Sequence, residues 1–217
     1  DCFLLGEKLE TLKSSKYRVN SNSNFQRLQT LIANSIAHSP LDKDEIYKNI
    51  IKDLQSHFFP VAPSDKATLR ELLAGHIEVD VECADWKEAV RRSAQPLLEQ
   101  EYLSEQYITQ MIRNIETMGP YIVLAPGFAL PHESPDVGGK KLGMQLIRLK
   151  QPVPFHSQFY DPVDFVCCLS TIDKDSHLKA MFHLMNLLAK ADFCENIRKA
   201  KSAEEIYQII YEYESIL

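Results

Sequence analysis

The chain has 217 residues, 45% of them hydrophobic and 25% charged, which is typical of a globular protein with a sizeable core. The net charge of −6 falls on residues 66–217, since residues 1–65 hold 8 basic and 8 acidic side chains. A nucleic-acid-binding surface needs a basic face, so we expect no direct DNA or RNA contact. No signal peptide is visible, and no apolar run reaches the roughly 18 residues that cross a bilayer. We therefore expect a cytoplasmic protein without membrane insertion.

The cysteines give no sign of a disulfide framework or a metal site. Five are present without a CxxC pair, and Cys167 and Cys168 adjoin in the strand-like stretch "DFVCCLS". Because neighbours in a strand point to opposite faces, we interpret them as reduced core thiols. No cysteine–histidine cluster has zinc spacing, and no phosphate loop ending in GKT or GKS is present. We expect no metal and no other cofactor.

The first 63 residues predict a helical appendage. "KSSKYRVNSNSN" has the polarity of a linker, and apolar residues then recur at helical spacing over 25–36 and 46–58, which predicts a pair of helices. The prolines of "PVAPSD" mark a boundary, so we divide the chain into an appendage, 1–63, and a domain, 64–217. The apolar stripe from Phe25 to Ile36 leaves two roles open, a homodimer contact or burial against the chain's own domain.

Residues 64–217 alternate strand-like and helical patterns. The predicted strands are "HIEVDVE", "YIVLA", "GMQLIRL" and "VDFVCCLS". The predicted helices are "TLRELL", a segment from Trp86 to Leu98, "SEQYITQMIRNI", "SHLKAMFHLMNLLAK", "FCENIRKA" and "AEEIYQIIYEY". Pro96 should bend the second of these helices or remove one of its hydrogen bonds. Strands that are apolar on both faces, interleaved with helices, predict an α/β domain with its sheet sandwiched between helices.

One histidine lies in a stiffened loop at the end of a predicted strand, within "GPYIVLAPGFALPHESPDVGG" at residues 119–139. Pro131 fixes its own φ angle and restricts Leu130, so the turn that holds His132 is constrained. Gly127 before the histidine, and Gly138 and Gly139 after it, allow close approach of the backbone. An imidazole at a strand end is well placed for chemistry in an α/β protein. The same pattern suits a structural histidine, so the local features leave both interpretations open.

A second histidine opens a predicted helix. "STIDKDSHLKAMF" places His177 in the first turn, where Asp173, Asp175 or Ser176 is available as N-cap. The backbone N–H groups of such a turn can bind a phosphate. A histidine at the edge of the core is the alternative. We interpret the other five histidines as structural or solvent-facing.

The segment "DWKEAVRRSAQPLLEQEYLSEQYITQMIRNIETMGPYIVLAPGFALPHESPD" resembles the enzyme IIA domains of the fructose–mannitol superfamily (type 2) of the phosphotransferase system (PTS). The ascorbate branch shares the tryptophan-led helix, the "GPYIV" strand and the "APG-ALPH" loop. "KLGMQLIRLKQPVPF", "DPVDFVCCLSTIDKDSHLKAMFHLMNLL" and "SAEEIYQII" follow in the same order. The resemblance covers residues 66–217. It implies the IIA mannitol/fructose fold, a mixed sheet sandwiched between helices.

The resemblance also implies a phosphoryl carrier that needs no metal or nucleotide. In such domains the histidine of the "PH" loop, here His132, accepts a phosphoryl group from the phosphocarrier HPr and passes it to a cysteine of a IIB partner. His177 matches the histidine that lies beside the phosphorylation site in the family. A neutral imidazole is a competent nucleophile near pH 7. Transfer between carriers depends on in-line positioning and on donors for the phosphoryl oxygens.

The chain departs from the family pattern beside His132. Ascorbate-type proteins usually read "PHARP", whereas this chain reads "PHESP", so Glu133 and Ser134 stand where a small residue and an arginine are expected. The arginine that mannitol-type relatives place before the loop has no clear match in "NIETMGPYIV". A negative charge close to a dianion would weaken phosphoryl binding by roughly 1 kcal/mol.

Three roles follow from these features. The first is the C-terminal IIA-like domain of a sugar-responsive transcriptional antiterminator or activator, which the residues before the domain favour. The alternative is a transport IIA component that passes phosphate to a IIB cysteine for uptake of ascorbate or a related sugar. The third is a IIA-fold interaction module without transfer activity, for which Glu133 and Ser134 are the best support.

Overall fold

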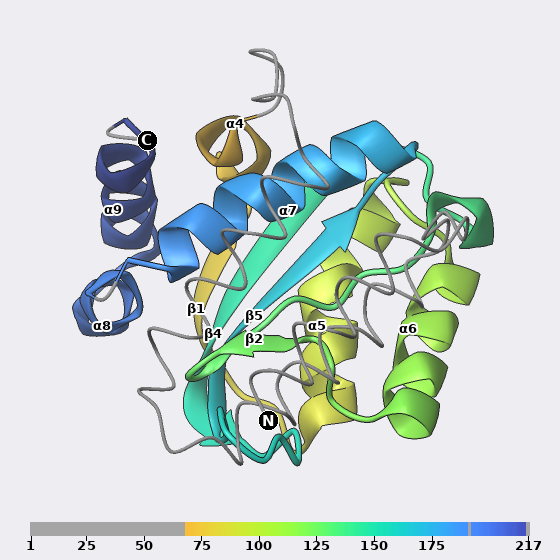
Figure 1. Cartoon of the computed structure of the whole chain (residues 1–217), viewed down its shortest axis with the longest axis horizontal. Helices are drawn as coiled ribbons and strands as arrows, with labels where there is room; N and C mark the ends of the chain where they lie inside the picture. The colour runs from red at the N-terminus through yellow and green to blue at the C-terminus, as the bar shows by residue number, and fades with distance from the viewer. Residues whose placement is uncertain (1–67, 191, 216–217) are drawn as a thin grey trace, which may run out of the picture. The chain divides into compact units, whose positions relative to one another are not determined.

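The computed structural model describes residues 68–190 and 192–215, and Figure 1 shows the arrangement of their helices and strands. The predicted helical pair and the predicted boundary at residue 63 lie outside these residues. Within them, the predicted order of strands and helices is confirmed, with one strand more than the sequence indicated.

The described strands form one mixed sheet in the order β1-β4-β5-β3-β2. Their bounds are β1 (Ile77–Val81), β2 (Val123–Ala125), β3 (Phe128–Ala129), β4 (Gly143–Val153) and β5 (Val163–Ser170). β1 runs parallel to β4 and β3 parallel to β5, whereas β4 with β5 and β2 with β3 are antiparallel. β3 is the strand that the sequence did not predict, because its two residues lie inside the proline- and glycine-rich stretch that reads as a loop.

Most helices begin at a side chain that accepts a hydrogen bond from the first turn, which explains where they start. The helices are α4 (Leu69–Leu73), α5 (Trp86–Glu99), α6 (Glu105–Met118), α7 (Lys174–Leu188), α8 (Phe193–Lys199) and α9 (Ala203–Glu214), with a 3-10 turn, η1 (Pro135–Val137). Thr68, Asp85, Ser104, Asp173 and Ser202 cap α4, α5, α6, α7 and α9. α5 continues through Pro96 to Glu99, so the proline costs it one backbone donor without ending it.

The helices form two groups on either side of the sheet (Figure 1). α5 and α6 pack against each other and α5 against β4 and β5, whereas α4, α7, α8 and α9 contact one another. Cys168 belongs to the apolar cluster beneath α5 and α6, and Cys167, equally buried, lies outside that cluster. The sheet is therefore covered on both faces, which confirms the predicted sandwich.

A side-chain clamp holds the β2–β3 turn against α8. Gly127 at this turn has a φ angle of +78°, and its carbonyl accepts from the N–H groups of Asp164 and Phe165 at 2.9 Å each. The guanidinium of Arg198 donates to both carboxylate oxygens of Asp164 and, at 3.3 Å, to Pro126 O. This packing leaves no room for a side chain, because a Cβ on Gly127 would lie 2.3 Å from Asp164 Oδ1.

We expect Gly127→Ala to destabilise the domain more than Gly75→Ala. Gly75 has a similar φ of +75°, but among the described residues no atom lies within 4 Å of its added Cβ. Gly75→Ala should cost about 1 kcal/mol of unfolding free energy from backbone strain alone. Gly127→Ala should cost about 1–3 kcal/mol more, because the Asp164–Arg198 pair must move. Urea unfolding of the two variants measures the difference, and equal losses would contradict the steric role of the clamp.

Candidate functional site

The loop that holds His132 continues the path of β3 along the end of β5. The N–H of Leu169 donates to Pro131 O at 3.0 Å, and His132 forms an isolated parallel bridge with Leu169. The N–H of Leu130 donates to Ile122 O at 2.8 Å on the other side. The backbone on both sides of the loop that holds His132 is thus hydrogen-bonded, to β5 through Leu169 and to Ile122.

The His132 ring has a defined orientation and protonation pattern. Its Nδ1 lies 2.8 Å from Leu130 O, and since a carbonyl can only accept, Nδ1 carries the hydrogen. The lone pair of the neutral ring is then on Nε2. Only 3% of the residue is exposed, and this burial lowers the pKa of His132 below its usual value. The ring is therefore a neutral imidazole with a nucleophilic Nε2 at neutral pH.

His177 comes to the same place from the helix that follows β5. Asp173 is the N-cap of α7, and among the three caps that the sequence offered its carboxylate is the one that accepts from Ser176 N–H. The rings of His132 and His177 have centroids 5.0 Å apart at an angle of 52°. Burial, and then the proximity of His132, lower the pKa of His177 to about 3. The two predicted site residues therefore lie together as a pair of neutral imidazoles.

The carboxylate of Glu133 is largely buried and accepts hydrogen bonds from the protein. It is 9% exposed, and its Oε1 accepts from Ser134 N–H at 2.8 Å while its Oε2 accepts from the side-chain amide of Asn114 on α6. Burial raises the pKa of Glu133, and these two hydrogen bonds oppose that rise. Both carboxylate oxygens thus have donors from the protein, which reduces the penalty that the sequence suggested for this residue.

Tyr107 of α6 fastens the backbone of the site. Its hydroxyl accepts from Glu133 N–H at 3.0 Å and lies 2.8 Å from Glu133 O and 3.0 Å from Leu169 O, to which it can donate. Tyr107 lies within the predicted helix "SEQYITQMIRNI", but its polar role was not predicted. A buried tyrosine needs a partner for its hydroxyl, and this rule is the signal that could have pointed to it.

Two further observations concern the same described residues, 68–190 and 192–215. None of their helices is long and apolar enough to span a membrane. They contain no group of three or more His, Cys, Asp or Glu side chains arranged to hold a metal ion.

Comparison with known proteins assigns the domain. Residues 72–213 match the family "Phosphoenolpyruvate-dependent sugar phosphotransferase system, EIIA 2". The chain belongs to this family. The EIIA component of the ascorbate-specific PTS of Salmonella choleraesuis is 31% identical over 145 residues, which cover 65% of this chain and 94% of that protein.

Solved structures agree with the fold. The mannitol-specific cryptic phosphotransferase enzyme IIA CmtB from Escherichia coli is 34% identical, with a TM-score of 0.59 over 65% of this chain and 99% of that one. The enzyme IIA of mannitol from Escherichia coli, solved in complex with its phosphorylated enzyme IIB, is 20% identical with a TM-score of 0.56, over 64% of this chain and 96% of that one. The predicted mixed-sheet IIA fold is confirmed, and the domain is a PTS EIIA phosphoryl-carrier domain.

The buried neutral His177 predicts a dependence of stability on pH. Its folded-state pKa of about 3 lies below the value of about 6.5 in an unfolded chain, so the unfolded state binds more protons as the pH falls. The unfolding free energy should therefore fall between about pH 6 and 4, with His177 contributing up to ~1.4 kcal/mol per pH unit. His177→Asn should flatten this slope in urea unfolding at a series of pH values. An unchanged slope would show that His177 does not stay neutral when folded.

Proposed function

We propose that this domain is the IIA component of a sugar-transport PTS, which accepts a phosphoryl group on Nε2 of His132 and passes it to a cysteine of a IIB partner. The observation that carries the proposal is the pairing of two neutral imidazoles 5.0 Å apart, one of them with its Nδ1–H held by Leu130 O. A nucleophile whose tautomer is set in advance needs no general base at the moment of attack.

Phosphoryl transfer to His132 and onward to IIB needs no reactant besides the two partner proteins. The Nε2 lone pair attacks phosphorus of the phosphorylated donor, HPr, the bond between phosphorus and the donor atom breaks, and its electron pair leaves with the donor. His132 keeps its Nδ1 proton, so the ring gains positive charge, and Leu130 O stabilises that charge as an acceptor. In the second step a IIB thiolate attacks phosphorus, and the Nε2 electron pair returns to His132.

His177 is the proposed donor to the phosphoryl oxygens. A neutral imidazole carries one N–H, and the pKa of about 3 keeps this ring neutral at working pH. A positioned donor that meets developing charge in a site closed to water acts more strongly than it would in solution. Because only 3% of His132 is exposed, we expect the approach of a donor protein to uncover the ring before transfer.

Similarity to transport components favours transport over the regulatory role. The curated relative from Salmonella choleraesuis is an ascorbate-specific PTS component, and the matched region covers 94% of that protein. Ascorbate or a related sugar is accordingly the proposed cargo of the partner system. The family match at residues 72–213 also supports the proposed division into an appendage, 1–63, and a IIA domain, 64–217.

The first test is acid-labile labelling by phosphorylated HPr. Wild type should take one phosphoryl group, and His132→Ala should take none, because Nε2 of His132 is the only acceptor in the proposal. His156→Ala, which removes an exposed histidine from a different loop, is the matched control and should label as wild type does.

His177→Asn in the same assay separates acceptor from donor. It should still be labelled, at a rate lower by about 10²-fold, which is the usual effect of removing one donor from such a site. Label on His132→Ala equal to that of wild type would remove the proposal, as would the absence of label on wild type.

The second test follows the label onward. Phosphorylated protein mixed with isolated IIB domains should pass its phosphoryl group to an ascorbate-type IIB and to a much smaller extent to a mannitol-type IIB. A IIB with its cysteine changed to serine is the control for transfer to that thiolate. Stable label on this protein in the presence of both IIB domains would argue against transport and for a regulatory or binding role.

A further inference from the structure

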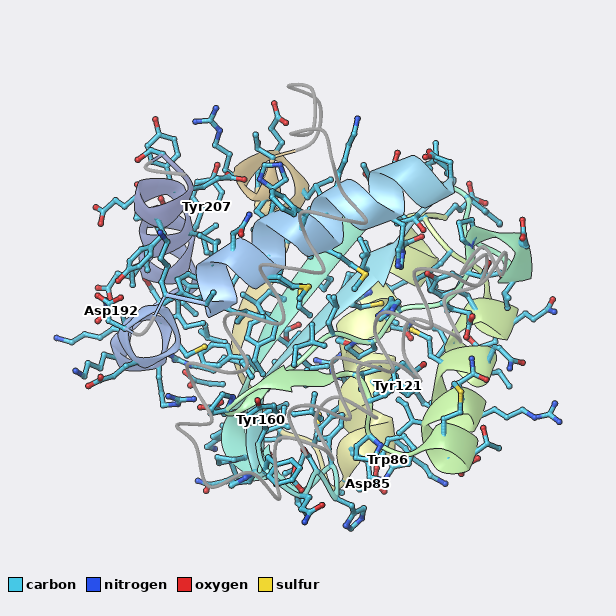
Figure 2. All side chains as sticks on the ribbon, in the orientation of Figure 1. Asp85, Trp86, Tyr121, Tyr160, Asp192 and Tyr207 are labelled. Atoms are coloured by element: carbon cyan, nitrogen blue, oxygen red, sulfur yellow. The ribbon has the colours of Figure 1, made fainter. Side chains whose placement is uncertain are left out.

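We infer that the hydroxyl of Tyr121 is a second donor to the phosphoryl group that His132 carries. The inference rests on the proposed function and adds to it a residue that stabilises the phosphorylated state. Tyr121 precedes β2, and Figure 2 shows it on the side of the domain where α5 and α6 lie.

The backbone brings Tyr121 to the histidine loop. Ile122, its neighbour, accepts the hydrogen bond from Leu130 N–H at 2.8 Å, so the segment with Tyr121 runs beside the segment that leads to His132. The two rings meet edge to face, with centroids 6.4 Å apart and an angle of 88° between planes. Tyr121 and His177 therefore both contact the ring of His132.

The Tyr121 hydroxyl is buried and makes no hydrogen bond to any part of the chain that the structure describes. Buried polar groups are normally bonded, so an exception requires an explanation. Tyr107 provides the contrast in the same site, since its hydroxyl contacts the backbone of both Glu133 and Leu169. The unmodified fold therefore bonds the hydroxyl of Tyr107, whereas the hydroxyl of Tyr121 has no hydrogen bond within the described residues.

The hydroxyl of Tyr121 stays protonated and is not used by Glu133. Burial, and then the charge of Glu133, raise the pKa of Tyr121 far above neutrality. Glu133 is near enough to act on Tyr121 electrostatically, but its two oxygens accept from Ser134 N–H and from Asn114 instead. Tyr121 is thus a neutral O–H donor at working pH.

A phosphoryl group on Nε2 supplies the acceptors that the unmodified site does not offer. It adds three oxygens to the ring that Tyr121 already contacts, and phosphoryl oxygens are strong acceptors. A bond of this kind exists only after phosphorylation, so it stabilises the phosphoprotein without stabilising the unmodified fold.

The test compares Tyr121→Phe with wild type in two measurements. The first is the equilibrium constant for phosphoryl exchange with HPr, which should fall about tenfold, as expected for the loss of one hydrogen bond to a charged group. The second is the thermal midpoint of the unphosphorylated protein, which should stay unchanged or rise, because the hydroxyl has no partner to lose there. Tyr207→Phe, a partly buried tyrosine of α9 on the other side of the domain, is the matched control and should change neither (Figure 2).

The outcomes separate this inference from the proposed function. Equal exchange constants for wild type and Tyr121→Phe, with both proteins labelled, overturn the inference and leave the phosphoryl carrier intact. A lowered thermal midpoint or an unfolded variant also overturns it, because the hydroxyl would then serve the unmodified fold. Absence of label on wild type removes the proposed function, and the inference falls with it.

Discussion

The domain depends on the way in which chain segments gather at the carboxyl end of β5. Leu169, next to last in that strand, donates its N–H to Pro131 O, and its carbonyl lies within bonding distance of the Tyr107 hydroxyl. Three residues after the strand, Asp173 caps the helix that presents His177. The loop with His132 and the helix with His177 are therefore both positioned from one strand end. This common origin is the reason that two residues far apart in the sequence place their rings in contact.

Burial then determines the chemistry of the two rings. An imidazole removed from water is harder to protonate, so His132 and His177 both remain neutral where an exposed histidine would be partly charged. In the proposed transfer, a neutral His132 is the nucleophile, and a neutral His177 carries one N–H that can donate to a phosphoryl oxygen. The cost is access, because a histidine that is only 3% exposed must be uncovered before a partner protein can react with it. A carrier with a reactive phosphorus–nitrogen bond gains from this, since the same cover excludes water.

Local pattern was sufficient for most of the fold, whereas the functional pairing of the two histidines came from the resemblance, because their local features left a structural role open. Helical spacing, capping residues and runs apolar on both faces predicted the described helices and four of the strands, and Pro131 indicated that His132 is constrained. β3 was missed because its two residues gain strand geometry from pairing with β5, a contact remote in sequence. The hydrogen bond from the Asn114 amide to the Glu133 carboxylate was missed for the same reason, because only the fold brings α6 against the loop that holds His132.

The hydrogen-bond partners of Tyr107 and Tyr121 distinguish a structural role from a functional one. Tyr107 and Tyr121 both reach the His132 loop, both are raised in pKa by burial, and composition or spacing cannot rank them. The difference lies in their partners. Tyr107 bonds to the backbone of Glu133 and Leu169 in the unmodified protein, so the energy of these bonds belongs to folding. The hydroxyl of Tyr121 has no such bond within the described residues, so burying it costs the fold the desolvation of that group. In the proposed function, phosphorylation of the adjacent His132 ring brings an acceptor to this hydroxyl.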